Sequence, residues 1–166
     1  MSHRTKSLAS NALVAALYLV LTAVFSFMSF GAVQFRIAEM LNHLVVFQKK
    51  YFWGIVSGVI LSNAVFMFSS GLGWYDLVFG VMHSVCSLGA TMFASKFLKN
   101  DTQRLVFNAL SFGFFSFLIA IELNIVLALP FWFSYGTVAL GEVVVMLVGV
   151  PIMKGLNSKI NFADKI

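Results

Sequence analysis

The chain has 166 residues, of which 60% are hydrophobic and 10% are charged, and its mean hydropathy is +0.94. Because soluble domains carry about 25% charged residues, this composition excludes an ordinary soluble protein and predicts an integral membrane protein. The net charge of +5 comes from basic residues in short groups between apolar runs, which argues against a nucleic-acid-binding patch. The single cysteine excludes a disulfide framework or CxxC metal site within the chain.

The apolar runs predict six membrane helices in chain order. The first run, about residues 8–30, is too long for a signal peptide and is interpreted as a retained helix. A short second helix is expected at about 37–48, and four further runs meet or approach the roughly 20 residues that a crossing needs. They are expected at about 51–70, 75–98, 104–129 and 131–154. The sequence therefore predicts an all-α integral membrane protein with one transmembrane domain over residues 1–166.

The basic residues predict the orientation of these helices. With six helices, 10 of the 11 lysines and arginines fall on one side of the membrane, and the exception is Arg36. Cytoplasmic loops carry an excess of Lys and Arg, so both termini are expected in the cytoplasm. Arg36 is left on the outer side with no topological reason to be there.

Polar residues from several helices are expected at one depth. Charged groups inside membrane helices are costly and usually face a bundle interior or a cavity. When depth is counted at about 1.5 Å of rise per residue along each predicted helix, six ionisable residues lie at or above the midplane on the outer side. This shared depth predicts a cavity that opens to the outside. The candidate substrate-binding residues are Gln34, Arg36, Glu39, Asn42, Asp76, His83, Glu122, Trp132, Tyr135 and Glu142.

Most of these residues also have a purely structural interpretation. Arg36 and Glu39, three residues apart, fit a simple ion pair at the membrane interface, and His83 fits a packing residue. The acidic residues of the fifth and sixth helices fit neutral carboxyls bonded to neighbouring helices. Trp132 and Tyr135 fit an outer aromatic belt.

The first helix carries a stripe of small residues that includes Ala12 and Ala16. Small residues four apart let another helix approach closely, either within the bundle or on a separate membrane subunit. The chain has no GxxxxGK[ST] loop, no HExxH motif and no GxSxG elbow. Any ATP hydrolysis that drives the protein is therefore expected in another polypeptide.

Several motifs resemble those of a known transporter family. VQFRIAEMLNHL at 33–44 resembles the "QFRxSE" signature of the queuosine-precursor transporter (QueT) family, the S components of energy-coupling factor (ECF) transporters. LSNAVF, WYDLVFG, FNAL, LPFWF and TVALGEVVV follow in the same order. The chain departs from the pattern at Ala38, where serine is expected, at Asn42 and His43, and in a long fifth helix that contains Glu122.

The resemblance implies a six-helix S-component fold whose outward-facing pocket is capped by the loop after the first helix. It implies a non-enzymatic, multi-pass substrate-binding subunit of a bacterial plasma membrane, with no cofactor, metal or nucleic acid. Its partners would be a transmembrane coupling subunit, docked on Ala12 and Ala16, and two cytoplasmic ATPases. The implied ligand is a 7-deazaguanine, such as the 7-cyano or 7-aminomethyl form, or queuine. A carboxylate that reads the base edge is then expected, with Glu142 preferred over Glu122 and Glu39.

Two other classes of function stay open. A self-sufficient secondary carrier of a polar nucleobase- or vitamin-like solute also places acids in the membrane, although 166 residues without a repeat is small for one. An intramembrane enzyme that uses His83 with Ser84 or Ser87 lacks an evident residue to orient the base. Purification distinguishes them, because an S component binds ligand alone and transports only with its partner subunits.

Overall fold

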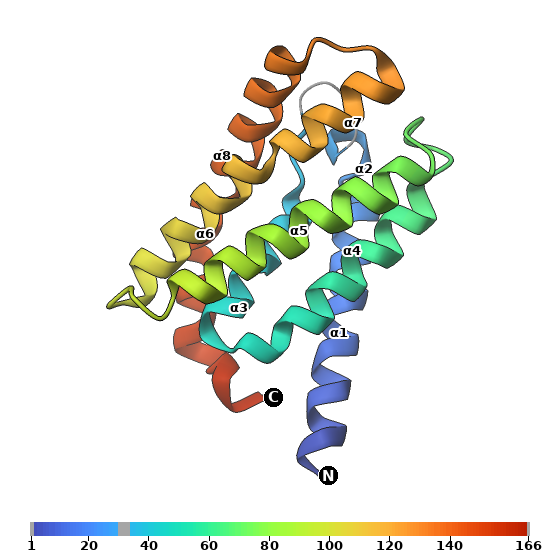
Figure 1. Cartoon of the computed structure of the whole chain (residues 1–166). Coiled ribbons are helices and arrows are strands. Elements are labelled where there is room, and N and C mark those ends of the chain that lie inside the picture. Colours follow the sequence, from blue (N-terminus) through green and yellow to red (C-terminus); the bar gives the residue numbers. More distant parts are fainter. Residues whose placement is uncertain (1, 30–33, 166) are drawn as a thin grey trace.

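The described part of the chain is helical throughout. The computed structural model describes residues 2–29 and 34–165, and every regular element in these ranges is a helix (Figure 1). The longer elements are α1 (His3–Val24), α4 (Phe52–Phe66), α5 (Trp74–Ala94), α6 (Asp101–Phe115), α7 (Phe117–Leu127) and α8 (Phe131–Ile160). The shorter ones are α2 (Ser26–Ser29), η1 (Ile37–His43), α3 (Leu44–Phe47), η2 (Lys49–Tyr51) and η3 (Phe162–Lys165). The predicted all-α membrane fold is confirmed.

Local sequence explains where the helices begin and end. Ser2 caps α1 by accepting a hydrogen bond from the backbone N–H of Thr5, and Asn100 caps α6 in the same way through Gln103. Such caps satisfy N–H groups that have no partner within the helix. α7 ends before Ala128, which adopts the left-handed conformation. Gly73, with a φ of 64°, directly precedes α5. The predicted ranges 75–98 and 131–154 start within a residue of α5 and α8, whereas α1 begins five residues before residue 8 and α8 continues six residues beyond 154.

Four of the six predicted crossings are long enough to span a membrane alone. Among the described residues, the stretches that qualify are Arg4–Val24, Trp74–Ala94, Asp101–Leu127 and Phe131–Ile160. α4 has 15 residues, so it extends about 22 Å and falls short of the about 30 Å of a hydrocarbon core. The segment from η1 to α3 is shorter still. Six crossings therefore remain a prediction, and the two short segments are the reason.

The short segment is sheltered by the rest of the bundle. η1 is a 3-10 helix whose Ala38, Glu39, Asn42 and His43 are buried, and it packs against α8 and α1. Irregular backbone at membrane depth is tolerated where protein rather than lipid surrounds it. The predicted lid, the loop after the first helix, includes residues 30–33, which lie outside the described residues. Only its second half, from Gln34 onward, can be placed.

Close helix packing brings α1 against α4. A Cβ on Gly58 would lie 2.7 Å from the Cβ of Tyr18, closer than real side-chain contacts allow. One turn earlier, the backbone N–H of Gly54 donates to Oδ1 of Asn11 at 2.8 Å. The two glycines thus let α1 approach α4 closely enough for Tyr18 to point into the bundle. In Figure 1, the 67–73 and 128–130 turns lie at one end of this bundle and both termini lie towards the other.

Candidate functional site

The interior of the bundle combines an apolar core with many buried polar residues, and its outer surface exposes large apolar side chains. Phe27, Phe68 and Trp132 are more than three-quarters exposed, as expected for side chains that face lipid. The predicted site residues with no more than 5% exposure are Gln34, Arg36, Glu39, Asn42, Asp76, His83, Glu122 and Glu142. Because buried ionisable groups in membrane helices mark functional positions by default, this buried set is the candidate site.

Arg36 connects segments that are far apart in the sequence. Its Nη2 donates to Oδ1 of Asn63 on α4 at 3.2 Å and lies 3.8 Å from Oδ1 of Asp76 on α5. Its Nη1 lies 3.9 Å from Oε1 of Glu39 on η1. Asn63 in turn donates to the backbone carbonyl of Asp76 at 2.8 Å. One guanidinium therefore holds η1, α4 and α5 together.

Glu39 is engaged on both of its carboxylate oxygens. The hydroxyl of Tyr18 on α1 donates to Oε1 at 2.7 Å, and Nδ2 of Asn42 donates to Oε2. The Arg36–Glu39 pair is therefore a buried part of a network and not the interfacial ion pair that the spacing also allowed. Glu39 serves first to anchor η1 and to orient Arg36.

The ionisable residues occupy two levels along the helix axes. Asp76 lies two residues into α5 and Glu122 lies five residues before the end of α7, so both are near the 67–73 and 128–130 turns. Glu142 lies eleven residues into α8, about 16 Å along the axis at about 1.5 Å per residue. His83, nine residues into α5, is similarly deep. We call the level of Asp76 and Glu122 the outer level and that of His83 and Glu142 the inner level.

Four carboxyl groups interact electrostatically with one cation. Arg36 interacts with Glu39, Asp76 and Glu142, while Glu122 interacts with Asp76 and with Arg36. We call these five residues the carboxylate cluster. Arg36 can balance one negative charge, so the cluster contains more carboxyl groups than its own cation neutralises.

The unsatisfied polar atoms of the site are mostly hydrogen-bond acceptors. Both carboxyl oxygens of Glu122 and of Glu142 have no hydrogen-bond partner within residues 2–29 and 34–165, and neither does Oδ2 of Asp76. Buried polar groups in native proteins are almost always hydrogen-bonded. So many buried acceptors without donors mark a place where a ligand rich in donors would be bound.

The two buried histidines have different roles. His43 uses both ring nitrogens, because Nε2 donates to the carbonyl of Met146 at 2.8 Å and Nδ1 accepts from Asn108 at 3.1 Å. In His83, Nε2 donates to the carbonyl of Phe112 at 3.0 Å, which leaves Nδ1 as an acceptor without a partner among the described residues. His43 is thus a satisfied packing residue, whereas His83 retains an open acceptor.

The contacts of His83 do not resemble a catalytic dyad. The hydroxyl of Ser87 donates to the backbone carbonyl of His83 at 2.7 Å and not to the imidazole ring. The hydroxyl of Ser84 has no partner in the described part of the chain. No activated nucleophile is therefore formed by these groups.

The predicted aromatic residues are less buried than the carboxylate cluster. Trp132 is 78% exposed and packs edge-on against Phe131. Tyr135 is half-buried, and its hydroxyl donates to the carbonyl of Phe114 at 3.3 Å. Their rings contact Phe131 and each other, which fits an aromatic belt, and a role in binding stays a prediction.

Sequence reasoning missed two residues of the network. Tyr18 and Asn63 hold Glu39 and Arg36, but each is a single polar residue within an apolar helix. Asn63 could have been noticed as an amide side chain within an apolar membrane helix. Gly80 is linked to it, because a Cβ on Gly80 would collide with Nδ2 of Asn63. Gln34 joins the site through its backbone, whose carbonyl oxygen occupies the space that a Cβ on Gly141 would need.

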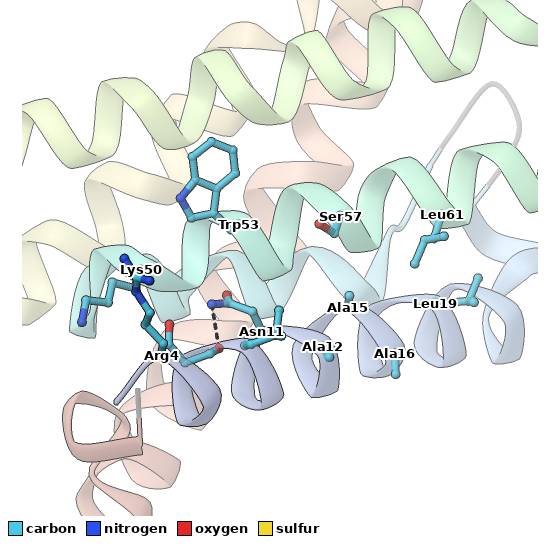
Figure 2. A pocket seen from close by; sticks show the side chains of 12 residues that line it. Arg4, Asn11, Ala12, Ala15, Ala16, Leu19, Lys50, Trp53, Ser57 and Leu61 are labelled. Carbon is cyan, nitrogen blue, oxygen red and sulfur yellow. Dashed lines mark hydrogen bonds between the residues drawn. The ribbon is translucent and has the colours of Figure 1, made fainter. Parts of the chain in front are cut away.

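Ala12 and Ala16 border an open groove on the outside of the bundle. The groove lies between α1 and α4 and has a volume of about 840 Å³ (Figure 2). Both alanines are exposed, whereas the neighbouring Ala15 is buried against α4. Arg4 and Lys50 lie at one end of the groove. The small-residue pair is therefore not used for packing within the described bundle.

Comparisons with known proteins agree with one another. The family model described as "QueT transporter" matches residues 8–158 of the chain. The queuosine precursor transporter QueT of Lactococcus lactis subsp. cremoris (strain MG1363) is 33% identical over 171 residues, which cover 96% of this chain and 97% of that protein. No solved structure matches the chain.

Proposed function

Since this chain belongs to the QueT transporter family, we propose that it binds a queuosine precursor, a 7-deazaguanine, at the carboxylate cluster. Membership in this family makes the chain a transporter and not an enzyme. The relative from Lactococcus lactis is named for transport of a queuosine precursor, and the proposal extends that substrate to this chain.

The surplus of buried acceptors is the observation that carries the proposal. A 7-deazaguanine presents a ring N–H and an exocyclic amino group side by side, and it has a further ring N–H in its five-membered ring. The acceptors of the site without a partner in the described residues are carboxyl oxygens, one imidazole nitrogen and the amide oxygen of Asn42, which require donors of this kind. The hydrogen-bond donors of the ligand therefore match the unpartnered acceptors of the site.

Glu142 is the proposed reader of the base edge. It is fully buried on the inner level, and both of its oxygens are unpartnered within the described residues. A carboxylate that accepts two adjacent donors forms a charge-assisted bidentate pair, which is strong and selective in geometry. Nδ1 of His83 supplies a further acceptor at a similar depth.

We further propose that the chain is the substrate-binding S component of an ECF importer. It would receive the ligand from outside and work with a transmembrane coupling subunit and two cytoplasmic ATPases. The exposed Ala12 and Ala16 support this, because a smooth small-residue surface lets a partner helix approach closely. Six crossings in one domain with both termini in the cytoplasm complete the proposal, and the basic residues support that orientation.

Ligand identification on the purified protein tests the proposed substrate. Mass spectrometry of a gently purified sample should detect a 7-deazaguanine, and calorimetry on the isolated chain should show binding to it and none to adenine. A chain that binds no 7-deazaguanine, or that binds adenine equally well, would contradict the proposal. Transport in proteoliposomes should require the partner subunits, whereas uptake by the chain alone would favour a secondary carrier.

A further inference from the structure

The two levels of the site differ in what their own residues leave unsatisfied. On the inner level, Glu142 and Nδ1 of His83 are open acceptors, and the base edge accounts for them under the proposed function. On the outer level, the open acceptors are both oxygens of Glu122 and Oδ2 of Asp76. A guanine-like ring whose edge is bound at Glu142 has already used its paired donors. The outer level therefore needs a donor from another part of the ligand.

Arg36 does not supply that donor to Glu122. Its guanidinium is committed to Oδ1 of Asn63 at 3.2 Å, to Oδ1 of Asp76 at 3.8 Å and to Glu39 at 3.9 Å. Glu122 has no ion pair and no hydrogen bond among the described residues, although it is 0% exposed on α7. Glu122 interacts electrostatically with Asp76 and with Arg36, whose opposite charges act on it in opposite directions. The carboxyl of Glu122 is thus an acid without an ion-pair partner within residues 2–29 and 34–165.

The spacing of the two acids fits one ligand that contacts both. Along the helix axes, Glu142 is about 9 Å deeper than Glu122 at about 1.5 Å of rise per residue. This separation is comparable to the length of a bicyclic base that carries a short substituent. The substituent on the five-membered ring would then point towards the outer level while the opposite edge contacts Glu142.

We infer that this chain selects the cationic, aminomethyl-bearing 7-deazaguanine, with Glu122 as the counter-ion of its ammonium group. The inference rests on the proposed function. An ammonium has three donors and a positive charge, which match the open oxygens of Glu122 and Asp76. A nitrile in the same place offers only a lone pair, which would face those acceptors. The hydroxyls of Ser62 and Ser134, also unpartnered in the described chain, can donate or accept and do not discriminate.

Calorimetry with three ligands tests the inference without any variant. The purified wild-type chain is titrated with 7-aminomethyl-, 7-hydroxymethyl- and 7-cyano-7-deazaguanine at neutral pH. Because hydrogen bonds to charged groups are about twice as strong as neutral ones, the aminomethyl form should bind at least about tenfold more tightly than the other two. Equal affinities, or a preference for the nitrile, would overturn the inference and leave the proposed function intact. Failure of all three ligands to bind would instead reject the proposed function.

The Glu122→Gln variant assigns the selectivity to one residue. It should bind the aminomethyl form about 10- to 100-fold more weakly and the nitrile within about threefold of wild type, since only the charge pair is lost. Asp101→Asn is the matched control, because it makes the same acid-to-amide change at an exposed position at the start of α6, whereas Glu122 is on α7. Equal weakening of both ligands would reject Glu122 as the counter-ion. Selective loss in Glu142→Gln would assign the ammonium to the inner level and overturn the inference.

Discussion

At the scale of single residues, the carboxylate cluster separates groups that hold the fold from groups that await a ligand. Arg36 and Glu39 have partners on α1, α4 and α5, whereas Glu122 and Glu142 have no hydrogen bond within the described chain. All four are among the candidate binding residues that the sequence predicts, with Glu142 preferred as the reader of the base edge. Their hydrogen bonds distinguish them, because removing one partner of a buried ion pair is strongly destabilising, whereas an unpartnered carboxyl has no such pair to break.

Removing one member of the Arg36–Glu39 pair should destabilise the protein. Arg36→Ala leaves Asp76 and Glu39 as unpaired buried acids, so it should cost about 3–5 kcal/mol and lower the melting temperature. Glu39→Ala should have a similar effect, and the double variant should cost less than the sum of the two. Thermal melts of the detergent-solubilised protein measure these costs. Strictly additive costs would mean that the two residues act independently.

Glu142→Gln should abolish selective binding while the fold remains intact. Glutamine keeps the shape of the side chain but places one amide donor against the donors of the base. Sites that lose a required hydrogen-bond partner can lose about 10⁴-fold or more in discrimination. Calorimetry with a 7-deazaguanine and with adenine measures the change, and an unchanged melting temperature excludes unfolding. Wild-type affinity for the 7-deazaguanine in this variant would make Glu142 a structural residue.

At the scale of helices, small residues determine which surfaces close and which stay open. Gly54 and Gly58 let α1 approach α4, while Ala12 and Ala16 on the other side of that contact remain exposed in the groove. The alanine stripe alone could not separate internal packing from docking, because both need small side chains. The glycines of α4 resolve the ambiguity, since they show which part of α1 is already covered.

Gly58→Ala should weaken the α1–α4 contact. The new Cβ would lie 2.7 Å from the Cβ of Tyr18, so the helices must move apart and shift the hydroxyl that binds Glu39. Overpacking of this kind costs about 1–3 kcal/mol. Gly89→Ala is a matched control because a Cβ on Gly89 meets nothing within 4 Å. It should be neutral or stabilising by about 0.5–1 kcal/mol. A Gly58→Ala protein as stable as the control would contradict the tight contact.

Ala12→Leu and Ala16→Leu should weaken assembly with the coupling subunit while ligand binding is retained. A leucine in the groove would hold a partner helix away from α1, and because both alanines are exposed the bundle itself has room for it. Co-purification with the partner subunits and calorimetry on the isolated chain measure the two effects. Ala9→Leu is the control, since Ala9 is exposed on α1 but lines a different groove. Undisturbed assembly in both variants would exclude this face as the docking surface.

At the scale of the whole molecule, the sequence predicted the long helices better than the segments that connect them. Long apolar runs determine helices with little ambiguity, and α5 and α8 begin within a residue of their predicted starts. The segment 37–43 is different, because it forms a 3-10 helix, which the apolar pattern did not predict, and it is packed against α8 and α1. The same holds for the site. The depth of each site residue could be estimated from its position in its predicted helix. The partners of Arg36 could not, because they depend on how three segments remote in sequence pack.

The distribution of basic residues also predicts how the whole bundle lies in the membrane. In Figure 1 the 95–100 turn and both termini lie towards one end, opposite the 67–73 and 128–130 turns. The open acceptors of the outer level lie near the latter turns, so a ligand would enter from that side. If the positive-inside rule holds here, this entrance faces the exterior.

Single cysteines test this orientation directly. In a Cys86→Ser background, Ser69→Cys in the exposed 67–73 turn should react with a membrane-impermeant maleimide in intact cells. Lys99→Cys, exposed in the 95–100 turn, should react only after the cells are permeabilised. Ser69 and Lys99 are both exposed, so reagent access and not local burial decides the labelling. Labelling of Lys99→Cys from outside would invert the molecule and place the outer acids at the cytoplasmic surface, where an importer could not receive its ligand.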